Sequence, residues 1–201
     1  MIDNDESKQE LIRDIYIKCI SKNYNGLESM LSENYTQDDM MKARQDRIHK
    51  QEWLIKDYFA SLISARVSYP GSHKNDCIAF EIMKELGPVL VDKFKNKIMY
   101  KNLRVTAEGP ILTIIVNEDV NYIKRETVRI EEGSSIGKCM YIDVYDTDGN
   151  IVTRRDIGLK SKNCYICNED ADICARTEKH TSRDIRNNII ARLEEYLKNS
   201  K

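Results

Sequence analysis

The sequence has little glycine or proline and no long apolar run. Among its 201 residues are 8 Gly and 3 Pro, and no segment has the biased composition of a linker or low-complexity region. No stretch approaches roughly 18 uninterrupted apolar residues, so we expect no transmembrane helix. The first ten residues are acidic and polar and lack the pattern of a signal peptide. These absences predict a cytoplasmic protein that does not associate with membranes.

The sequence also lacks an excess of charge of either sign. Its 32 basic and 33 acidic side chains nearly cancel, which argues against a nucleic-acid partner because such binders usually carry a basic excess. The six cysteines of a chain without a leader are expected to be reduced thiols. Three of them, Cys164, Cys167 and Cys174, crowd together, and this crowding requires a chemical explanation.

The hydrophobic pattern predicts one α+β domain with a mostly antiparallel sheet and flanking helices. In the helix expected from Thr36 to about residue 59, apolar residues share one face and should form its buried stripe: Met41, Ile48, Ile55 and Phe59. The other elements expected are helices at 7–25, 76–86, 118–130 and after 182, strands at 63–69, 98–106 and 111–116, and a hairpin at 140–152. Gly87-Pro88 should end the 76–86 helix. Residues 1–35 would form a helical extension to a domain at 36–201.

The helix that begins near Thr36 carries a first set of candidate ligand-binding residues. Arg44, Arg47 and Gln51 have i, i+3, i+7 spacing and therefore share a wedge beside the apolar stripe. In a cleft, such guanidinium groups could bind phosphate oxygens. They could equally lie along apolar surface or pair with acidic neighbours. The spacing alone leaves both possibilities open.

A turn at Tyr69-Pro70-Gly71-Ser72-His73-Lys74-Asn75 is a second candidate. It follows a strand and precedes a helix, and both an ammonium group and helix N-terminal amides favour anions. Lys74 could therefore bind phosphate there. The spacing is not that of a P-loop, and a simple turn is the alternative.

The crowded cysteines continue to a histidine in the pattern C-x2-C-x6-C-x5-H. Cys164, Cys167, Cys174 and His180 could together bind one Zn²⁺ ion in tetrahedral geometry, although the intervals are shorter than in a typical zinc finger. Three thiols packed in a compact turn are the alternative. A redox Cys-x-x-Cys is a third possibility, but the βαβ context that it requires is missing.

Taken together, these segments resemble the family of citrate lyase holo-acyl-carrier-protein synthases, often called CitX. The resemblance covers roughly residues 38–185 and depends on the joint order and spacing of several motifs. They are Arg44-x-x-Arg47-x-x-x-Gln51; Pro70, Gly71 and Lys74; Gly109-Pro110; Lys124, Thr127 and Glu131; Gly137-Lys138 with Ile142-Asp143-Val144; Asp148-Gly149; Arg154-Arg155-Asp156; and Cys164, Cys167, Ala171, Cys174, Ala175, Arg176 and His180.

The resemblance implies a reaction and its partners. The family moves a phosphoribosyl-dephospho-CoA group from its precursor, triphosphoribosyl-dephospho-CoA, to a serine of the citrate lyase acyl carrier protein (the gamma subunit), and diphosphate leaves. Such a reaction requires cations around the triphosphate. The residues expected to bind substrate are Arg44, Arg47, Gln51, Lys74, Lys138, Arg154 and Arg155, and those expected to be catalytic are Asp143 and Lys124. Mg²⁺ is an expected cofactor, with Asp143 as its ligand or as general base, and Zn²⁺ is a possible one.

The chain departs from the family at two positions. Lys138 replaces an arginine, and Tyr141 replaces the first carboxylate of an Asp-x-Asp pair that would suit Mg²⁺. Three other functions are compatible with the sequence: a zinc-binding interaction module, a catalytically inactive relative that binds the carrier protein, and a transferase for another carrier, such as that of a malonate decarboxylase.

Overall fold

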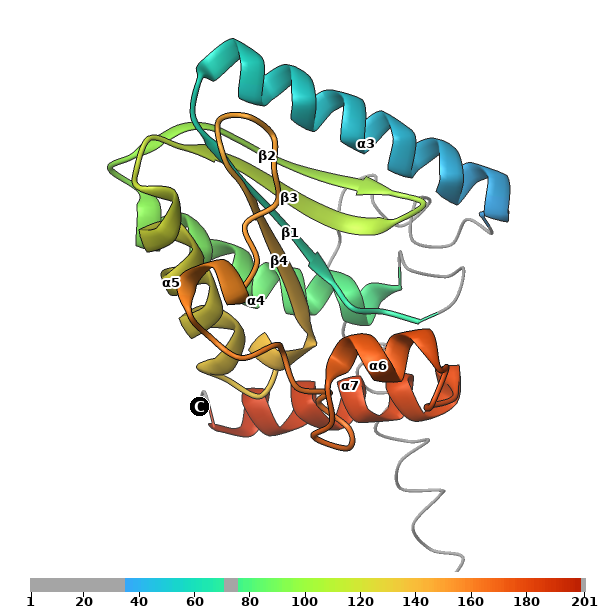
Figure 1. Ribbon diagram of the computed structural model, residues 1–201. Coiled ribbons are helices and arrows are strands. Elements are labelled where there is room, and N and C mark those ends of the chain that lie inside the picture. The colour runs from blue at the N-terminus through green and yellow to red at the C-terminus, as the bar shows by residue number, and fades with distance from the viewer. Residues whose placement is uncertain (1–34, 71–75, 200–201) are drawn as a thin grey trace, which may run out of the picture.

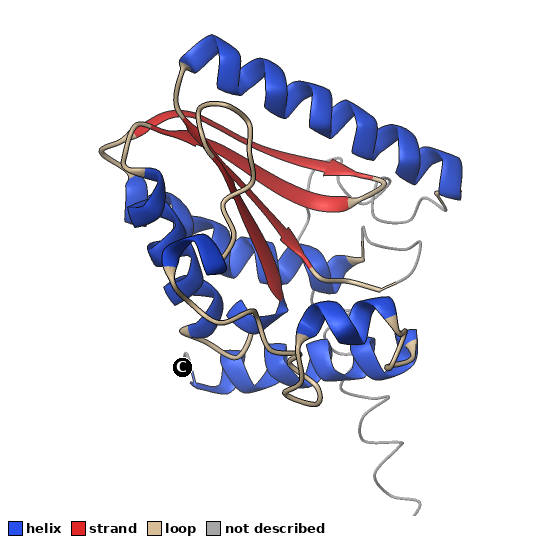
Figure 2. Ribbon diagram, in the orientation of Figure 1, coloured by secondary structure: helices blue, strands red, loops and turns tan. Residues whose placement is uncertain are grey.

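The computed structural model describes residues 35–70 and 76–199, and these residues form an antiparallel sheet with helices on both of its faces (Figures 1 and 2). The strands lie in the order β2-β3-β1-β4, and each pairs antiparallel with its neighbours. Their bounds are Ser61–Val67 for β1, Ile98–Thr106 for β2, Gly109–Val116 for β3 and Met140–Tyr145 for β4. The predicted α+β class is confirmed.

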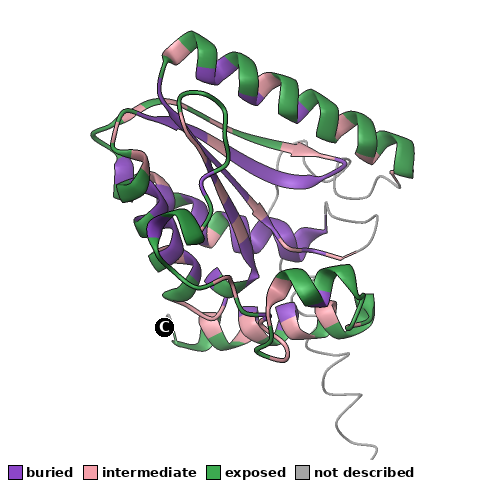
Figure 3. Cartoon of the chain, in the orientation of Figure 1, coloured by how far each residue is buried: buried purple, intermediate pink, exposed green. Residues whose placement is uncertain are grey.

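One face of the sheet forms the main hydrophobic core. Alternate residues of three strands, such as Ile63 of β1, Ile114 of β3 and Val144 of β4, are fully buried there, and Figure 3 shows the sheet as largely buried. Helices α4 (Cys77–Phe94), α5 (Val120–Glu132) and α7 (Ser182–Asn199) contribute to the same cluster. Period-two alternation in the strands and apolar faces on the helices therefore meet in one core, as their sequence patterns predict.

Helix α3 (Gln37–Tyr58) lies on the opposite face of the sheet (Figure 1). Thr36 begins it with a capping box, in which Thr36 and Asp39 bond each other's backbone amides. Near its C-terminal end, Leu54 and Ile55 pack against Leu62 and Ile115 in a smaller apolar cluster.

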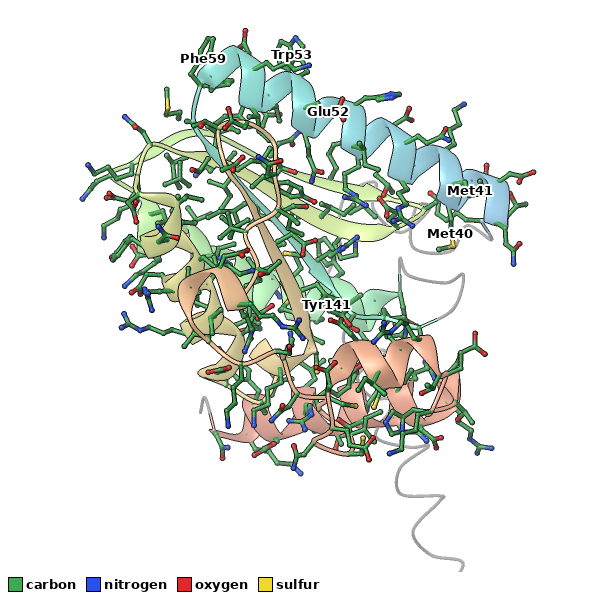
Figure 4. All side chains as sticks on the ribbon, viewed as in Figure 1. Met40, Met41, Glu52, Trp53, Phe59 and Tyr141 are labelled. Atoms are coloured by element: carbon green, nitrogen blue, oxygen red, sulfur yellow. The ribbon has the colours of Figure 1, made fainter. Side chains whose placement is uncertain are left out.

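The predicted buried stripe of α3 is wrong except at Ile55. Met41 is 61% exposed and Phe59 84% exposed, and Ile48 is exposed as well (Figure 4). The buried face instead includes Arg47 and Gln51. Periodicity identifies residues that share a face of a helix, but here the ion pair of Arg47 with Glu108 in the β2–β3 turn, and the apolar contacts near the end of α3, decide which face turns inward.

Two other elements differ from their predictions. Helix α4 continues through Gly87-Pro88 to Phe94, because Leu90 and Phe94 gain burial in the core while proline removes only one backbone hydrogen bond. The hairpin after β4 returns by a single bridge between Tyr145 and Ile151. The chain then crosses the front of β4 and forms the short helix α6 (Ala171–Arg176), which was not predicted.

Two predicted features lie outside the described residues: the helix at 7–25 and most of the turn that contains Lys74. Within the described ranges, no helix is long and apolar enough to cross a membrane.

Candidate active site and metal centre

Three cavities open beside β4 and meet at Tyr141, which lines all of them (Figure 4). We call them the cationic cavity (about 650 Å³), the cysteine cavity (about 550 Å³) and the α3 cavity (about 510 Å³). Burial raises the pKa of the Tyr141 hydroxyl, so this side chain is a neutral phenol near neutral pH. Tyr141, one of the two positions where the sequence departs from the CitX pattern, therefore lines all three cavities.

The cationic cavity brings together both predicted catalytic residues, Lys124 and Asp143, and two of the predicted phosphate-binding residues, Arg154 and Arg155. It is lined by five cations and three carboxylates, so it carries an excess of positive charge. The cations are Lys124, Arg154, Arg155, Lys162 and Arg176, and the carboxylates are Glu131, Asp143 and Asp172.

Charged side chains on the wall of this cavity also cap the exposed edge of β4. The Ile142 amide donates to Glu131 at 3.0 Å, and Lys124 Nζ donates to the Ile142 carbonyl at 3.4 Å. Lys162 Nζ donates to the Met140 carbonyl. An edge strand presents unpaired backbone groups, and these side chains satisfy them. Burial lowers the pKa of both Lys124 and Lys162.

The two consecutive arginines of the cavity have different surroundings. Arg154 is nearly buried and forms ion pairs of 2.5 Å with Glu131 and with Glu132. Arg155 forms no ion pair with any described residue, and its guanidinium donates to Ser161 Oγ at 3.3 Å. Arg155 is therefore the cation of this pair that is available to an anionic ligand.

The predicted catalytic carboxylate, Asp143, belongs to a polar network beneath α3. Arg66 Nη2 donates to Asp143 Oδ2 at 2.9 Å, and Arg66 also lies 4.0 Å from Glu108. Glu108 in turn binds Arg47 through two hydrogen bonds, of 2.7 and 3.1 Å, and Arg47 contacts Gln51. The network therefore joins β1 and β4 to helix α3 and to the β2–β3 turn, and it does so through charge pairs rather than apolar packing.

This arrangement does not fit a Mg²⁺ ion held by β4. The strand presents one carboxylate, Asp143, and Arg66 already neutralises it. The phenol of Tyr141 stands at the i−2 position, where a second carboxylate would face the same side. Because hard cations prefer several charged oxygen ligands, the residues present do not form the expected two-carboxylate site.

The four predicted zinc ligands converge on one point. Their ligand atoms all lie within 4.8 Å of one another. Cys164 Sγ is 3.3 Å from His180 Nε2, and Cys167 Sγ is 3.5 Å from Cys174 Sγ. Tetrahedral Zn²⁺ with bonds of about 2.3 Å to sulfur places its ligand atoms about 3.8 Å apart. The cluster can therefore hold a metal ion such as zinc.

Local backbone structure and electrostatics prepare this cluster for a metal. Asn163 and Asp170 form an isolated β-bridge, and Asp170 caps α6, which carries Cys174. A backbone amide at Glu169 lowers the pKa of the Cys167 thiol to about 7, whereas burial raises the pKa of Cys174. One thiolate is thus available near neutral pH to begin metal binding.

The remaining predicted residues lie in other places. Arg44 lines the α3 cavity, Lys138 lines the cysteine cavity, and neither forms an ion pair with a described residue. Arg47 and Gln51 are buried, and both line a small cavity of about 20 Å³ between α3 and strands β2 and β3. Arg44, Lys138 and Arg155 thus each line a different one of the three cavities that share Tyr141, although they are far apart in sequence.

Sequence reasoning missed several residues of the site. Lys162 lines two cavities, Arg66 binds Asp143, and Glu131 binds both Arg154 and Lys162. Arg66 is a polar member of an alternating strand, which marks only the face on which it lies. Glu131 was part of the matched pattern, but its partners are brought near it by the fold.

A cavity that gathers cations beside an edge strand, next to a cysteine and histidine cluster, is typical of proteins that can bind a polyanionic ligand. Comparison with known proteins identifies which one. A family model described as apo-citrate lyase phosphoribosyl-dephospho-CoA transferase (CitX) matches residues 35–196. The chain belongs to this family, as the motif resemblance predicts.

Curated relatives agree with the family match. The chain is 27% identical over 164 residues to a probable apo-citrate lyase phosphoribosyl-dephospho-CoA transferase of Vibrio cholerae, with 79% of this chain and 89% of the relative covered. It is 26% identical over 160 residues to the apo-citrate lyase phosphoribosyl-dephospho-CoA transferase of Shigella flexneri, with 78% and 87% covered. The protein is therefore an enzyme of the transferase class, which attaches the phosphoribosyl-dephospho-CoA group to apo-citrate lyase.

Proposed function

We propose that this protein transfers the phosphoribosyl-dephospho-CoA group from triphosphoribosyl-dephospho-CoA to a serine of the citrate lyase acyl carrier protein. The serine oxygen forms a bond to the phosphorus nearest the ribose, the bond to the terminal two phosphates breaks, and diphosphate leaves. The observation that carries the proposal is the cationic cavity beside β4, in a chain of the CitX family. Residues 36–201 carry this activity, and residues 1–35 are an extension to it.

The cations of the cavity neutralise charge that moves to the departing diphosphate. Arg155 and Lys162 contact the triphosphate directly, because Arg155 has no ion pair with a described residue and Lys162 lies between two cavities. Arg154 and Lys124 line the same wall and add positive potential, although both also have structural partners. Cations fixed in place before the reaction stabilise a charged transition state more than mobile water does.

Asp143 accepts the proton of the attacking serine. Arg66 binds its Oδ2 atom and fixes the direction of the carboxylate, and Oδ1 has no hydrogen bond with a described residue. A carboxylate held in one orientation is suited to general-base catalysis. Mg²⁺ remains an expected requirement of the substrate triphosphate, but no step is assigned to an ion held by β4.

The four-ligand cluster holds structural zinc. Three cysteines and one histidine fill the coordination sphere, and a closed sphere of this kind stabilises a fold rather than activating water. The cluster joins residues 164–180, a segment whose only helix is the six-residue α6, so its stability depends on the metal.

The mass of the carrier protein tests the proposed reaction. Purified apo-carrier is incubated with this protein, triphosphoribosyl-dephospho-CoA and Mg²⁺. We expect a mass increase of one phosphoribosyl-dephospho-CoA group, which is absent when the acceptor serine is replaced by alanine. Arg155→Gln should slow the transfer, whereas Lys160→Gln is the matched control, because Lys160 is exposed and lines none of the three cavities. No mass increase with a folded, zinc-loaded protein and a working control synthase contradicts the proposal.

A further inference from the structure

The proposed reaction gives the cysteine cavity no role, although its lining is suited to binding a ligand. Its walls include the side chains of Pro70, Tyr165, Ile166 and Ile185, together with the ring of Tyr141. Its charged side chains are Lys138, Lys162 and Glu178. At about 550 Å³ it falls within the size range of cavities that bind cofactor-sized molecules. A cavity with apolar and aromatic walls and two cations suits a ligand that contains both an aromatic ring system and a diphosphate group.

Two residues form the boundary between the cysteine cavity and the cationic cavity. Tyr141 and Lys162 line both, and Lys162 Nζ lies 5.1 Å from the centre of the Tyr141 ring. The Lys162 ammonium donates to Glu131 at 3.3 Å and to the Met140 carbonyl. An ammonium has three N–H donors, so one remains without an acceptor among the described residues. A ligand that spans both cavities would pass this free donor.

The donor substrate has the same two-part character. One end is a triphosphate on a ribose, and the other is dephospho-CoA, which carries an adenine ring, a diphosphate and an uncharged pantetheine chain. We propose that the cysteine cavity is the dephospho-CoA subsite and that the cationic cavity holds the triphosphate, with Lys162 contacting the donor between them. This inference rests on the proposed function.

The charges and ring faces of the cysteine cavity match this ligand. Tyr165 lines the cavity with a half-buried ring, which is fixed where its hydroxyl donates to the Ser68 carbonyl at 3.4 Å and where the Arg192 guanidinium lies 5.8 Å from the ring centre. Purines stack on such rings. Lys138 and Lys162 supply the cations that a diphosphate requires. Ala171, at the start of α6, is a small residue on the wall that leaves room for the ligand.

Binding of the two fragments separately tests the assignment. The full chain, loaded with zinc, is titrated calorimetrically with 3′-dephospho-CoA and, in a separate experiment, with inorganic tripolyphosphate. Ala171→Trp and Ile166→Trp fill the cysteine cavity only. Ile173→Trp is the matched control, because Ile173 is 47% exposed on α6 and lines none of the three cavities. Zinc content and circular dichroism verify that each variant is folded.

We expect both cavity-filling variants to weaken dephospho-CoA binding at least about tenfold and to leave tripolyphosphate binding unchanged, and we expect the control to change neither. Arg155→Gln should weaken tripolyphosphate binding alone, and Lys162→Gln should weaken the binding of both fragments. Unchanged dephospho-CoA affinity in both folded filling variants overturns the subsite, and so does mutual displacement of the two fragments.

The fragment-binding experiment and the transfer experiment can fail separately, so each tests its own proposal. A protein that binds both fragments as expected but does not charge the carrier keeps the subsites and contradicts the proposed function. A protein that charges the carrier although the filling variants bind dephospho-CoA normally keeps the function and contradicts the subsite.

Discussion

Arg47 is on the buried face of α3, and its guanidinium donates to both carboxylate oxygens of Glu108. The two side chains are 9% and 8% exposed. The two charges have left water, and each is stabilised mainly by the other. At the scale of single residues, a cation that fits a phosphate-binding pattern thus has a well-formed structural partner. The pair also orients Arg66, and through it Asp143, because Glu108 contacts both arginines.

Removing one member of this pair should lower the free energy of unfolding more than removing both. We expect Arg47→Met to lower the free energy of unfolding by about 3–5 kcal/mol, because the Glu108 carboxylate is left buried without its partner. The double variant Arg47→Met/Glu108→Leu should recover much of that loss. Urea denaturation of the single and double variants measures both effects. A loss that is equal or larger in the double variant contradicts this account of the network.

Gly137 connects the end of α5 to the start of β4, and the contact there is very close. A Cβ atom at this position would lie 2.9 Å from the carbonyl oxygen of Glu131 and still closer to that of Ile130. Because these are backbone atoms of α5, they could move aside only if the helix backbone were distorted. At the scale of elements, glycine therefore allows the edge strand to begin directly against the helix that caps it.

An added methyl group should separate these two elements. We expect Gly137→Ala to lower the free energy of unfolding by about 1–3 kcal/mol, the usual range for overpacking. Gly87→Ala within α4 is the control, since its Cβ would meet Leu112 at an ordinary 3.6 Å and alanine favours a helix. Thermal unfolding distinguishes the two, and an equal loss of stability in both would contradict the predicted clash.

The cysteine segment should behave as a metal-dependent element. We expect one zinc ion per chain in the purified protein and less than about one tenth of this in Cys167→Ala, measured by elemental analysis, because three remaining ligands bind zinc weakly. Cys139→Ala is the matched control. Cys139 is buried away from the cluster, and burial raises its pKa to about 12, so it is not a thiolate ligand. Full zinc content in Cys167→Ala would eliminate the cluster as the metal site.

At the scale of the whole molecule, the fold separates cations with a structural partner from cations without one. Arg154 is bound to Glu131 and Glu132, and Arg155 faces the cavity without an ion pair to a described residue. We expect Arg155→Gln to raise the KM for the precursor roughly tenfold, the effect of one lost charge-assisted hydrogen bond, and to leave the unfolding midpoint unchanged.

Arg154→Gln, unlike Arg155→Gln, should lower the stability of the fold. The Glu131 side chain is only 6% exposed, and the substitution removes its shortest ion pair. We expect a lowered unfolding midpoint and also a lower kcat of the folded protein, because Arg154 adds positive potential to the cationic cavity. Steady-state kinetics beside thermal unfolding measures both variants. An Arg155→Gln variant with unchanged KM contradicts its assignment to the triphosphate.

The sequence predicted most elements because their periodicity is strong and local. Strands β2 and β3, helix α5 and the start of α3 near Thr36 lie where the patterns place them. The convergence of Cys164, Cys167, Cys174 and His180 was also predictable, because four residues within a span of seventeen can meet without the rest of the fold. The buried face of α3 and the length of α4 were not, because each depends on contacts with distant parts of the chain.

The sequence by itself determined the family, the α+β class and the spacing of the metal ligands, since all three are properties of residue order along the chain. Only the tertiary structure decided which cations carry ion pairs and that three cavities meet at Tyr141. The reason is physical: an ion pair such as Arg47–Glu108 joins residues 61 positions apart, and its energy depends on burial that exists only in the folded protein.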